Sequence, residues 1–228
     1  RLNHANIVKL QDIVEGADGT YVALEYVPGR DLREVLTYLY ERHRKTPPQS
    51  AGYVVVEILR ALEHAHAAVD GLGKSLGIVH RDVNPSIVLM SAEGAIKLTD
   101  FGLVHMRGRI SQPTAPRIVK GKIRYLAPDY IETQNLSASA DVYGAGLILF
   151  ELLSGEFCFA GDQDAVRIMR AIVREGVDYG PLESTPGPLA AVDRRATNRD
   201  PNERNRSAGE LRSALEQALA PLGYVSST

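Results

Sequence analysis

Two short acidic motifs carry the residue types in this sequence that are best suited to chemistry. One is His-Arg-Asp at residues 80–82, and the other is Asp-Phe-Gly at residues 100–102. Their aspartates, Asp82 and Asp100, are 18 positions apart, and a hairpin between them would bring both carboxylates to its open end. Neighbouring carboxylates can accept a proton or hold a hard cation such as Mg²⁺. The spacing therefore predicts one site built from both motifs.

A third motif, Ala-Pro-Asp at residues 127–129, follows the first two, with its aspartate 27 positions after Gly102. Each motif alone occurs by chance in many proteins, whereas the three in this order are specific. Residues 138–153 come next and are apolar on nearly every side, which predicts a helix buried all round and ended by Gly155. Such a helix would organise the core on which the motifs rest.

Short β-branched and aromatic runs predict two hairpins that position the motifs. Residues 88–90 and 96–98 form the hairpin between the first two motifs. Residues 7–14 and 21–26 form an N-terminal hairpin, and two strands alone are only marginally stable. The N-terminal hairpin therefore needs a neighbour that this sequence does not supply ahead of it.

Helical periodicity dominates the rest of the chain. Thr46 followed by two prolines predicts a capping box with proline in the first turn of a long helix. The core stripe of that helix comprises Ala51, Val54, Val55, Ile58, Leu59, Leu62 and Ala65. Ser207 opens a last amphipathic helix through Leu211, Leu215 and Leu219. These elements predict a mainly helical body.

Bulk composition excludes several classes of protein. The chain has 228 residues, of which 44% are hydrophobic and 24% charged, and this is enough for one substantial core. Its net charge of −2 gives no reason to expect a nucleic-acid partner. The single cysteine, Cys158, excludes a disulfide framework, so a cytoplasmic setting is expected. No apolar run is long enough to span a membrane. The chain opens on Arg1 with no visible leader, and we expect this start to be the edge of something longer.

The three motifs, with the hairpin between the first two and the buried helix after the third, resemble a eukaryotic-like protein kinase of the bacterial serine/threonine type. The resemblance runs from about Leu2 to about Leu222. It implies an α+β, kinase-like fold in which residues 1–27 are a remnant of the N-lobe, comprising the end of the regulatory helix, two strands and the hinge. Residues 28–228 would be the mainly helical C-lobe. It also implies ATP and Mg²⁺ as cofactors and a protein substrate or signalling partner.

The resemblance assigns catalytic roles to matching residues. Asp82 falls where the family's catalytic base orients or accepts the proton of the substrate hydroxyl. Asn84 falls in the catalytic loop where a lysine commonly touches the transferring phosphate. Asp100 falls where a carboxylate holds Mg²⁺ on the ATP phosphates. Asp82 and Asn84 are therefore expected to be catalytic, and Asp100 to bind metal and nucleotide.

The nucleotide-binding residues implied by the resemblance lie on two segments. In the hinge, Leu24 would be the gatekeeper, and the backbone of Glu25 and Val27 would face the adenine. Leu89 would pack under the base, and Asp31 would lie near the ribose. Their residue types alone do not show this, because the Leu and Val residues would be core residues in any case.

Other matching positions have supporting roles in the family. Three residues fit the hydrophobic stack that couples the lobes: Leu10, His80 and Phe101. Asp141 would brace the backbone of the first motif from the buried helix, and Asp129 would pair with Arg204. Ser111 and Thr114 lie in the activation segment, where ordinary solvated hydroxyls are expected, although phosphorylation could pair them with Arg81.

The sequence also departs from the family pattern. Ile87 stands where the family has an asparagine that supplies the second metal ligand, and isoleucine offers no oxygen. Asn84 replaces the catalytic-loop lysine, and Asp129 shortens a glutamate. The 228 residues contain no Gly-rich loop, no strand lysine and no helix glutamate to pair with it. Losing one positioned contact can cost on the order of 100- to 1000-fold in rate, so this chain alone is expected to be inactive or very weak.

Three functions remain open from the sequence. The first is a protein serine/threonine kinase domain, the preference for serine and threonine being inferred from Asn-Pro-Ser at residues 84–86. The second is a pseudokinase that acts as a binding or signalling module, and a Gly-rich loop and lysine upstream would argue against it. The third is a small-molecule kinase of the aminoglycoside-phosphotransferase type. Residues 120–129, which resemble a peptide-docking segment, and the helix that contains Asp141 argue against the third.

Overall fold

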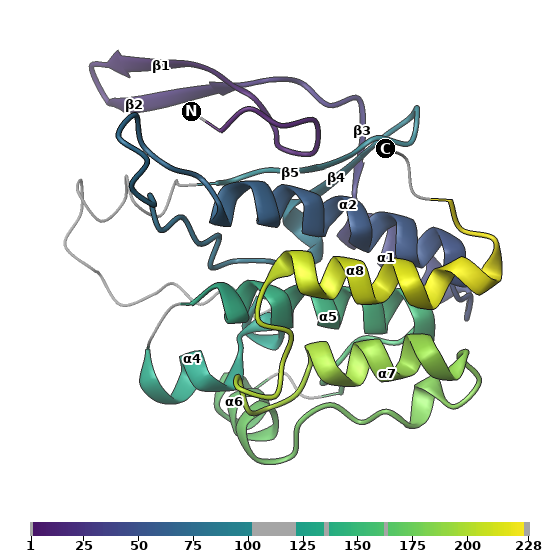
Figure 1. The fold of residues 1–228 in the computed structure, drawn as a ribbon. Helices are drawn as coiled ribbons and strands as arrows, with labels where there is room; N and C mark the ends of the chain where they lie inside the picture. The colour runs from purple at the N-terminus through teal and green to yellow at the C-terminus, as the bar shows by residue number, and fades with distance from the viewer. Residues whose placement is uncertain (1, 102–121, 135–136, 162–163, 226–228) are drawn as a thin grey trace.

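The computed structural model describes residues 2–101, 122–134, 137–161 and 164–225 (Figure 1). Gly102, Ser111 and Thr114 lie outside the described residues, as does most of the segment that leads to the third motif. The fold is a helical body with two small antiparallel sheets on one side, which confirms the α+β class.

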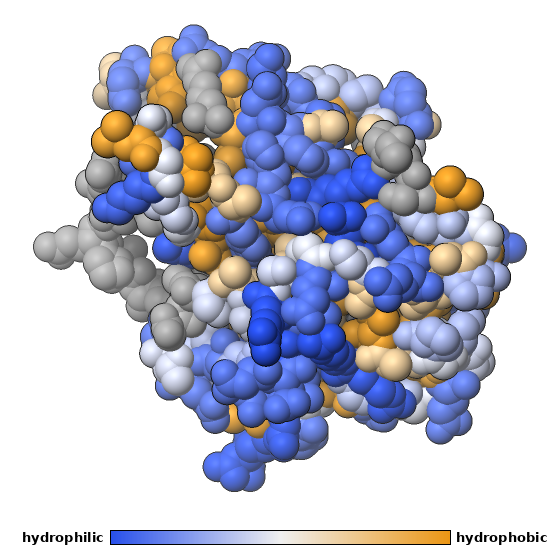
Figure 2. Space-filling view, in the orientation of Figure 1, coloured by the Kyte–Doolittle hydropathy of each residue, from blue (hydrophilic) through white to orange (hydrophobic). Residues whose placement is uncertain are grey.

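The first sheet is the N-terminal hairpin of β1 (Leu10–Gly16) and β2 (Gly19–Leu24). Its strands are largely exposed, with Tyr21 at 55% exposure. Figure 2 shows hydrophobic residues among hydrophilic ones at this end of the molecule. Strand β1 begins at Leu10 and not at residue 7, where the sequence predicted its start. Ile7 and Val8 are buried ahead of it, and the Val8 N–H donates to the Leu98 carbonyl at 2.8 Å. The hairpin is thereby tied to the second sheet.

The second sheet contains β3 (Gly29–Asp31), β4 (Val88–Ser91) and β5 (Ile96–Leu98), in that spatial order. Strands β4 and β5 are the predicted hairpin, and they pair antiparallel. Strand β3 was not predicted from the sequence. A Cβ at Gly29 would come within 1.8 Å of the Met90 carbonyl oxygen, so this close strand approach requires glycine.

The helices form the rest of the molecule. Helix α5 (Ala138–Ser154) lies at the centre and is buried from Asp141 to Ser154, which confirms the predicted buried helix. Gly155 ends it with φ of 72°, a conformation that favours glycine. Helix α2 (Pro48–His66) packs against both α5 and α8 (Ala208–Leu219), and α7 (Gly187–Ala196) packs against α5 and α8 (Figure 1). The remaining helical elements are α1 (Leu32–Glu41), η1 (Pro85–Ile87), η2 (Ile123–Tyr125), α4 (Pro128–Thr133), α6 (Ala165–Arg174), η3 (Gly180–Leu182) and η4 (Ala220–Leu222).

Capping agrees with the sequence at one helix and differs at another. Ser207 caps α8, since its Oγ accepts from the Glu210 N–H at 3.1 Å, as predicted. The capping box expected at Thr46 does not form, because Pro47 is the N-cap of α2 and makes no side-chain bond. Across the described ranges, the helices are too short or too polar to cross a membrane.

Candidate active site

Asn84 fixes the shape of the loop that carries Asp82. Its Nδ2 donates to both the backbone oxygen and Oδ1 of Asp82 at 2.8 Å, and its Oδ1 accepts from the Ser86 N–H at 3.0 Å. Asn84 is only 1% exposed. Its side chain thus turns inward and holds one oxygen of the Asp82 carboxylate.

Lys122 holds the other oxygen. Its Nζ forms an ion pair with Asp82 Oδ2, and both side chains are about one-third exposed. Sequence reasoning missed this contact, because 40 residues separate the partners and no local pattern joins them. A small cavity of about 20 Å³, roughly the room for one water molecule, adjoins both residues. The structure therefore completes the Asp82 site with a cation from the segment ahead of η2.

Asp141 braces the backbone of the first motif, as predicted. Its Oδ2 accepts from the His80 N–H and from His66 Nε2, and its Oδ1 accepts from the Arg81 N–H, each at 2.8 Å. Arg81 has φ of 72°, a conformation that is uncommon for a side chain of this kind. The buried carboxylate on α5 therefore fixes a strained turn directly before Asp82.

The second motif contacts the first through backbone and ring. The Thr99 N–H donates to the Ile87 carbonyl at 3.0 Å, and His80 Nε2 bonds the Thr99 carbonyl at 2.9 Å. The rings of His80 and Phe101 meet edge to face with centroids 4.5 Å apart, as expected for the predicted stack. Asp100 follows with φ of 65° and an exposed side chain. A single cleft that both Asp82 and Asp100 face stays a prediction.

Ile87 fills an apolar position. Its side chain is 1% exposed and belongs to the main hydrophobic core. Within the described ranges, no group of three or more His, Cys, Asp or Glu side chains could hold a metal ion. The exposed Asp100 carboxylate could ligate Mg²⁺, but the pair of protein ligands implied by the family does not fit this chain.

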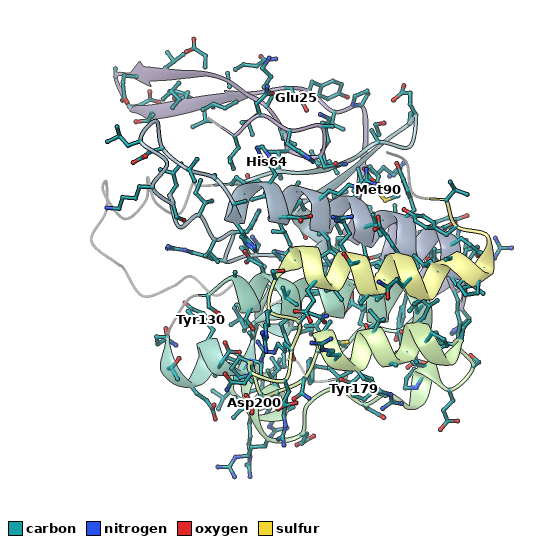
Figure 3. The ribbon with its side chains drawn as sticks, viewed as in Figure 1. Glu25, His64, Met90, Tyr130, Tyr179 and Asp200 are labelled. Carbon is teal, nitrogen blue, oxygen red and sulfur yellow. The ribbon has the colours of Figure 1, made fainter. Side chains whose placement is uncertain are left out.

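Two of the six predicted nucleotide residues, Asp31 and Leu89, lie in one row across the second sheet. Asp31 pairs with Leu89 across β3 and β4, and Leu89 pairs with Lys97 across β4 and β5. Directly paired residues share a face of a sheet. Lys97 Nζ contacts Glu25 Oε1 at 2.6 Å. This ion pair joins the residue after the N-terminal hairpin to the row (Glu25 is labelled in Figure 3).

The two other hinge residues flank Glu25. Leu24 ends β2 and is 37% exposed, whereas Val27 is half-buried. The Glu25 N–H donates to the Lys9 carbonyl at 2.9 Å, so this N–H serves the sheet. Asp31 has a structural role as well, because its carboxylate caps α1 by accepting from the Glu34 N–H at 2.9 Å.

The third motif is anchored to the core by buried charges. Asp129 Oδ1 lies 2.7 Å from Arg204 Nη2, which confirms the predicted pair. Tyr125, just before the motif, donates its hydroxyl to Glu151 Oε2 at 2.8 Å, and the Cys158 N–H donates to Glu151 Oε1 at 3.1 Å. Burial outweighs these bonds and raises the pKa of Glu151 to about 7.

The raised pKa of Glu151 predicts a pH-dependent stability. The folded state holds the Glu151 proton more tightly than an ordinary glutamic acid with a pKa of 4.5. The free energy of unfolding should therefore fall by up to about 3 kcal/mol as the pH rises from 4.5 to 7. Denaturant unfolding at several pH values should show a smaller fall in Glu151→Gln, which keeps an oxygen for Tyr125.

A residual slope is expected in that variant, because burial also raises the pKa of Asp193. Identical slopes in the original protein and Glu151→Gln would show that Glu151 is already charged in the folded state at pH 5.

Comparisons with known proteins agree with the geometry. The family described as "Protein kinase domain" matches residues 1–211. A probable serine/threonine-protein kinase of Streptomyces coelicolor is 33% identical over 226 residues, which cover 96% of this chain and 32% of that protein. Serine/threonine-protein kinase PknB of Mycobacterium leprae is 32% identical, with 94% of this chain and 33% of that protein covered. Tyrosine-protein kinase MasK of Myxococcus xanthus is 28% identical, with 96% and 32% covered.

The chain thus spans about a third of the length of these relatives. The family match covers nearly the whole sequence, and it agrees with the braced first motif, the hairpin that joins it to the second motif and the pair of Asp129 with Arg204. The chain belongs to the protein kinase domain family.

Proposed function

We propose that this domain transfers the γ-phosphate of ATP to a serine or threonine hydroxyl of a protein, with a weakened metal site. The observation that carries the proposal is the fixation of Asp82. Asp141 braces the backbone before it, and Asn84 and Lys122 hold its two carboxylate oxygens. A positioned carboxylate is what a loose phosphoryl-transfer transition state needs to orient the attacking hydroxyl.

The other site residues take the roles implied by the family. Leu24, Glu25 and Val27 bind the adenine edge, and the row that contains Asp31 and Leu89 binds the rest of the nucleoside. The pairing of Asp31 with Leu89, and of Leu89 with the Lys97 that contacts Glu25, supports this assignment. In this proposal, residues 1–27 belong to the small lobe and residues 28–228 form the large lobe.

Asp100 would bind Mg²⁺ that the nucleotide phosphates bring with them. Ile87 supplies no ligand, so the ion keeps more of its water than in a site with two protein ligands. Metal binding in this proposal therefore depends mainly on the nucleotide.

The preference for serine and threonine rests on the catalytic loop and on relatives. Asn-Pro-Ser at residues 84–86 lacks the Ala-Ala-Arg type of sequence found in tyrosine kinases, and two of the relatives above are named serine/threonine-protein kinases. One relative is named a tyrosine-protein kinase. Phosphoamino-acid analysis of a labelled protein substrate would separate the two acceptors.

A second candidate function is that of a pseudokinase, a signalling module that binds partners without transferring phosphate. The burial of Ile87 in the core favours it, because an apolar side chain replaces a metal ligand at that position. ATP turnover by a form in which a Gly-rich loop and a strand lysine precede residue 1, either encoded upstream or added by fusion, distinguishes the two functions.

Residues 1–228 alone are predicted to transfer no detectable phosphate. They contain neither the lysine nor the glycine-loop donors that clamp the phosphates, so nucleotide binding should be weak and only slightly dependent on Mg²⁺. Calorimetry with ATP, with and without Mg²⁺, and a radiolabel transfer assay would measure both properties. Tight, strongly metal-dependent binding would contradict the prediction.

A further inference from the structure

The catalytic loop has no lysine two residues after Asp82, yet a lysine from another segment lies against its carboxylate. Asn84 stands at the loop position where a lysine is common, and its amide is fully used within the loop. The ammonium of Lys122 lies on Asp82 Oδ2 instead. We propose that Lys122, from the segment ahead of η2, is a catalytic residue that supplies a cation in place of the loop lysine during phosphate transfer, an inference that rests on the proposed function.

The backbone of Lys122 is fixed, which preorganises its side chain. Its carbonyl accepts from the Tyr125 N–H at 3.2 Å, and the Tyr125 hydroxyl is bonded to the buried Glu151. The ammonium is thus carried on a segment tied to α5, the same helix that braces Asp82 through Asp141. A charge held on such a support costs little reorganisation when the reaction occurs.

The ammonium can also reach beyond Asp82. Its side chain is 38% exposed, and an ammonium has three donors, of which Asp82 needs only one. The small cavity beside both residues is lined by Arg81, Val83 and Tyr125 among others, and it has room for a group of the size of a hydroxyl. Lys122 can therefore contact a phosphate oxygen while it holds Asp82.

Phosphate transfer in this site forms one bond, breaks one bond and moves one proton. The acceptor hydroxyl oxygen forms a bond to the γ-phosphorus of ATP, and the bond from that phosphorus to the bridging oxygen breaks, releasing ADP. The hydroxyl proton passes to the carboxylate of Asp82. Lys122 keeps its own proton throughout and offsets the negative charge on the phosphoryl oxygens, which is the main requirement of this transition state.

The test uses a form of the protein in which a Gly-rich loop and a strand lysine precede residue 1, either encoded upstream or added by fusion. Lys122→Met should lower kcat about tenfold with little change in the KM for ATP, a smaller loss than for an enclosed donor because solvent screens this side chain. Lys122→Arg should retain most of the rate, since it keeps the charge. Lys45→Met, at an exposed lysine whose Nζ lies 3.2 Å from Ser184 Oγ, is the matched control and should be unchanged.

A rescue variant separates a catalytic role from a structural one. Adding Asn84→Lys to Lys122→Met returns a cation to the loop, and it should recover part of the lost kcat. Thermal unfolding of each variant checks that folding is retained.

Each other outcome overturns the inference in a recognisable way. If the longer protein transfers phosphate and Lys122→Met transfers it equally fast, the inference fails and the proposed function stands. A faster Lys122→Met would show that Lys122 locks Asp82 and inhibits transfer. If the longer protein itself transfers none, the proposed function fails and the role of Lys122 fails with it.

Discussion

Replacing Asp141 with alanine is expected to lower the free energy of unfolding by about 3–5 kcal/mol, the scale for removing one partner of a buried charged network. The variant would leave the N–H groups of His80 and Arg81 and the ring of His66 without their acceptor in the interior. Each orphaned buried donor costs about 1–3 kcal/mol. Urea denaturation monitored by circular dichroism measures the loss.

His66→Leu is the control for this prediction. It removes one of the three bonds to Asp141 and leaves both backbone donors satisfied, so the expected loss is about 1–2 kcal/mol. Equal losses in the two variants would show that the backbone bonds contribute nothing. An Asp141→Ala protein that is as stable as the original would show that α5 does not support the first motif.

Restoring an oxygen at position 87 is expected to raise the rate of ATP turnover at least tenfold, which corresponds to roughly 1.4 kcal/mol of barrier. If residues encoded upstream supply a Gly-rich loop and a strand lysine, the comparison is between that longer form and its Ile87→Asn variant, at saturating Mg²⁺. Asparagine offers a carbonyl oxygen to the ion, whereas Ile87 offers none. The dependence of the rate on Mg²⁺ should become steeper in the variant.

The gain should be accompanied by a loss of stability. Ile87 is a fully buried core residue, and placing an amide there costs about 1–3 kcal/mol when no metal is bound. Ile87→Ala is the matched control, because it removes the apolar side chain and adds no oxygen, and it should not gain activity. If the original protein turns over ATP rapidly and Ile87→Asn does not change it, Ile87 is not limiting and the pseudokinase function should be dropped.

Local and repeating features of the sequence determined much of the fold. The apolar composition of residues 138–153 predicted α5, because a helix with no polar face must be buried on every side. The run between the first two motifs predicted the hairpin of β4 and β5, since strand and turn signals lie within a few residues of one another. Motif order then identified the supports Asp141 and Arg204 through the resemblance to a family.

Contacts between distant parts of the chain were decided only by the tertiary structure. Strand β3 is three residues long and forms because β4 lies beside it, so no periodicity marks it in the sequence. Lys122 and Lys97 are partly exposed, where a lysine can pair with any acidic side chain nearby. The sequence therefore does not show that their partners are Asp82 and Glu25. The raised pKa of Glu151 likewise depends on burial, which the packing around α5 sets. The sequence determines which residue types are available at the site, whereas packing decides which charges meet and how far each is removed from water.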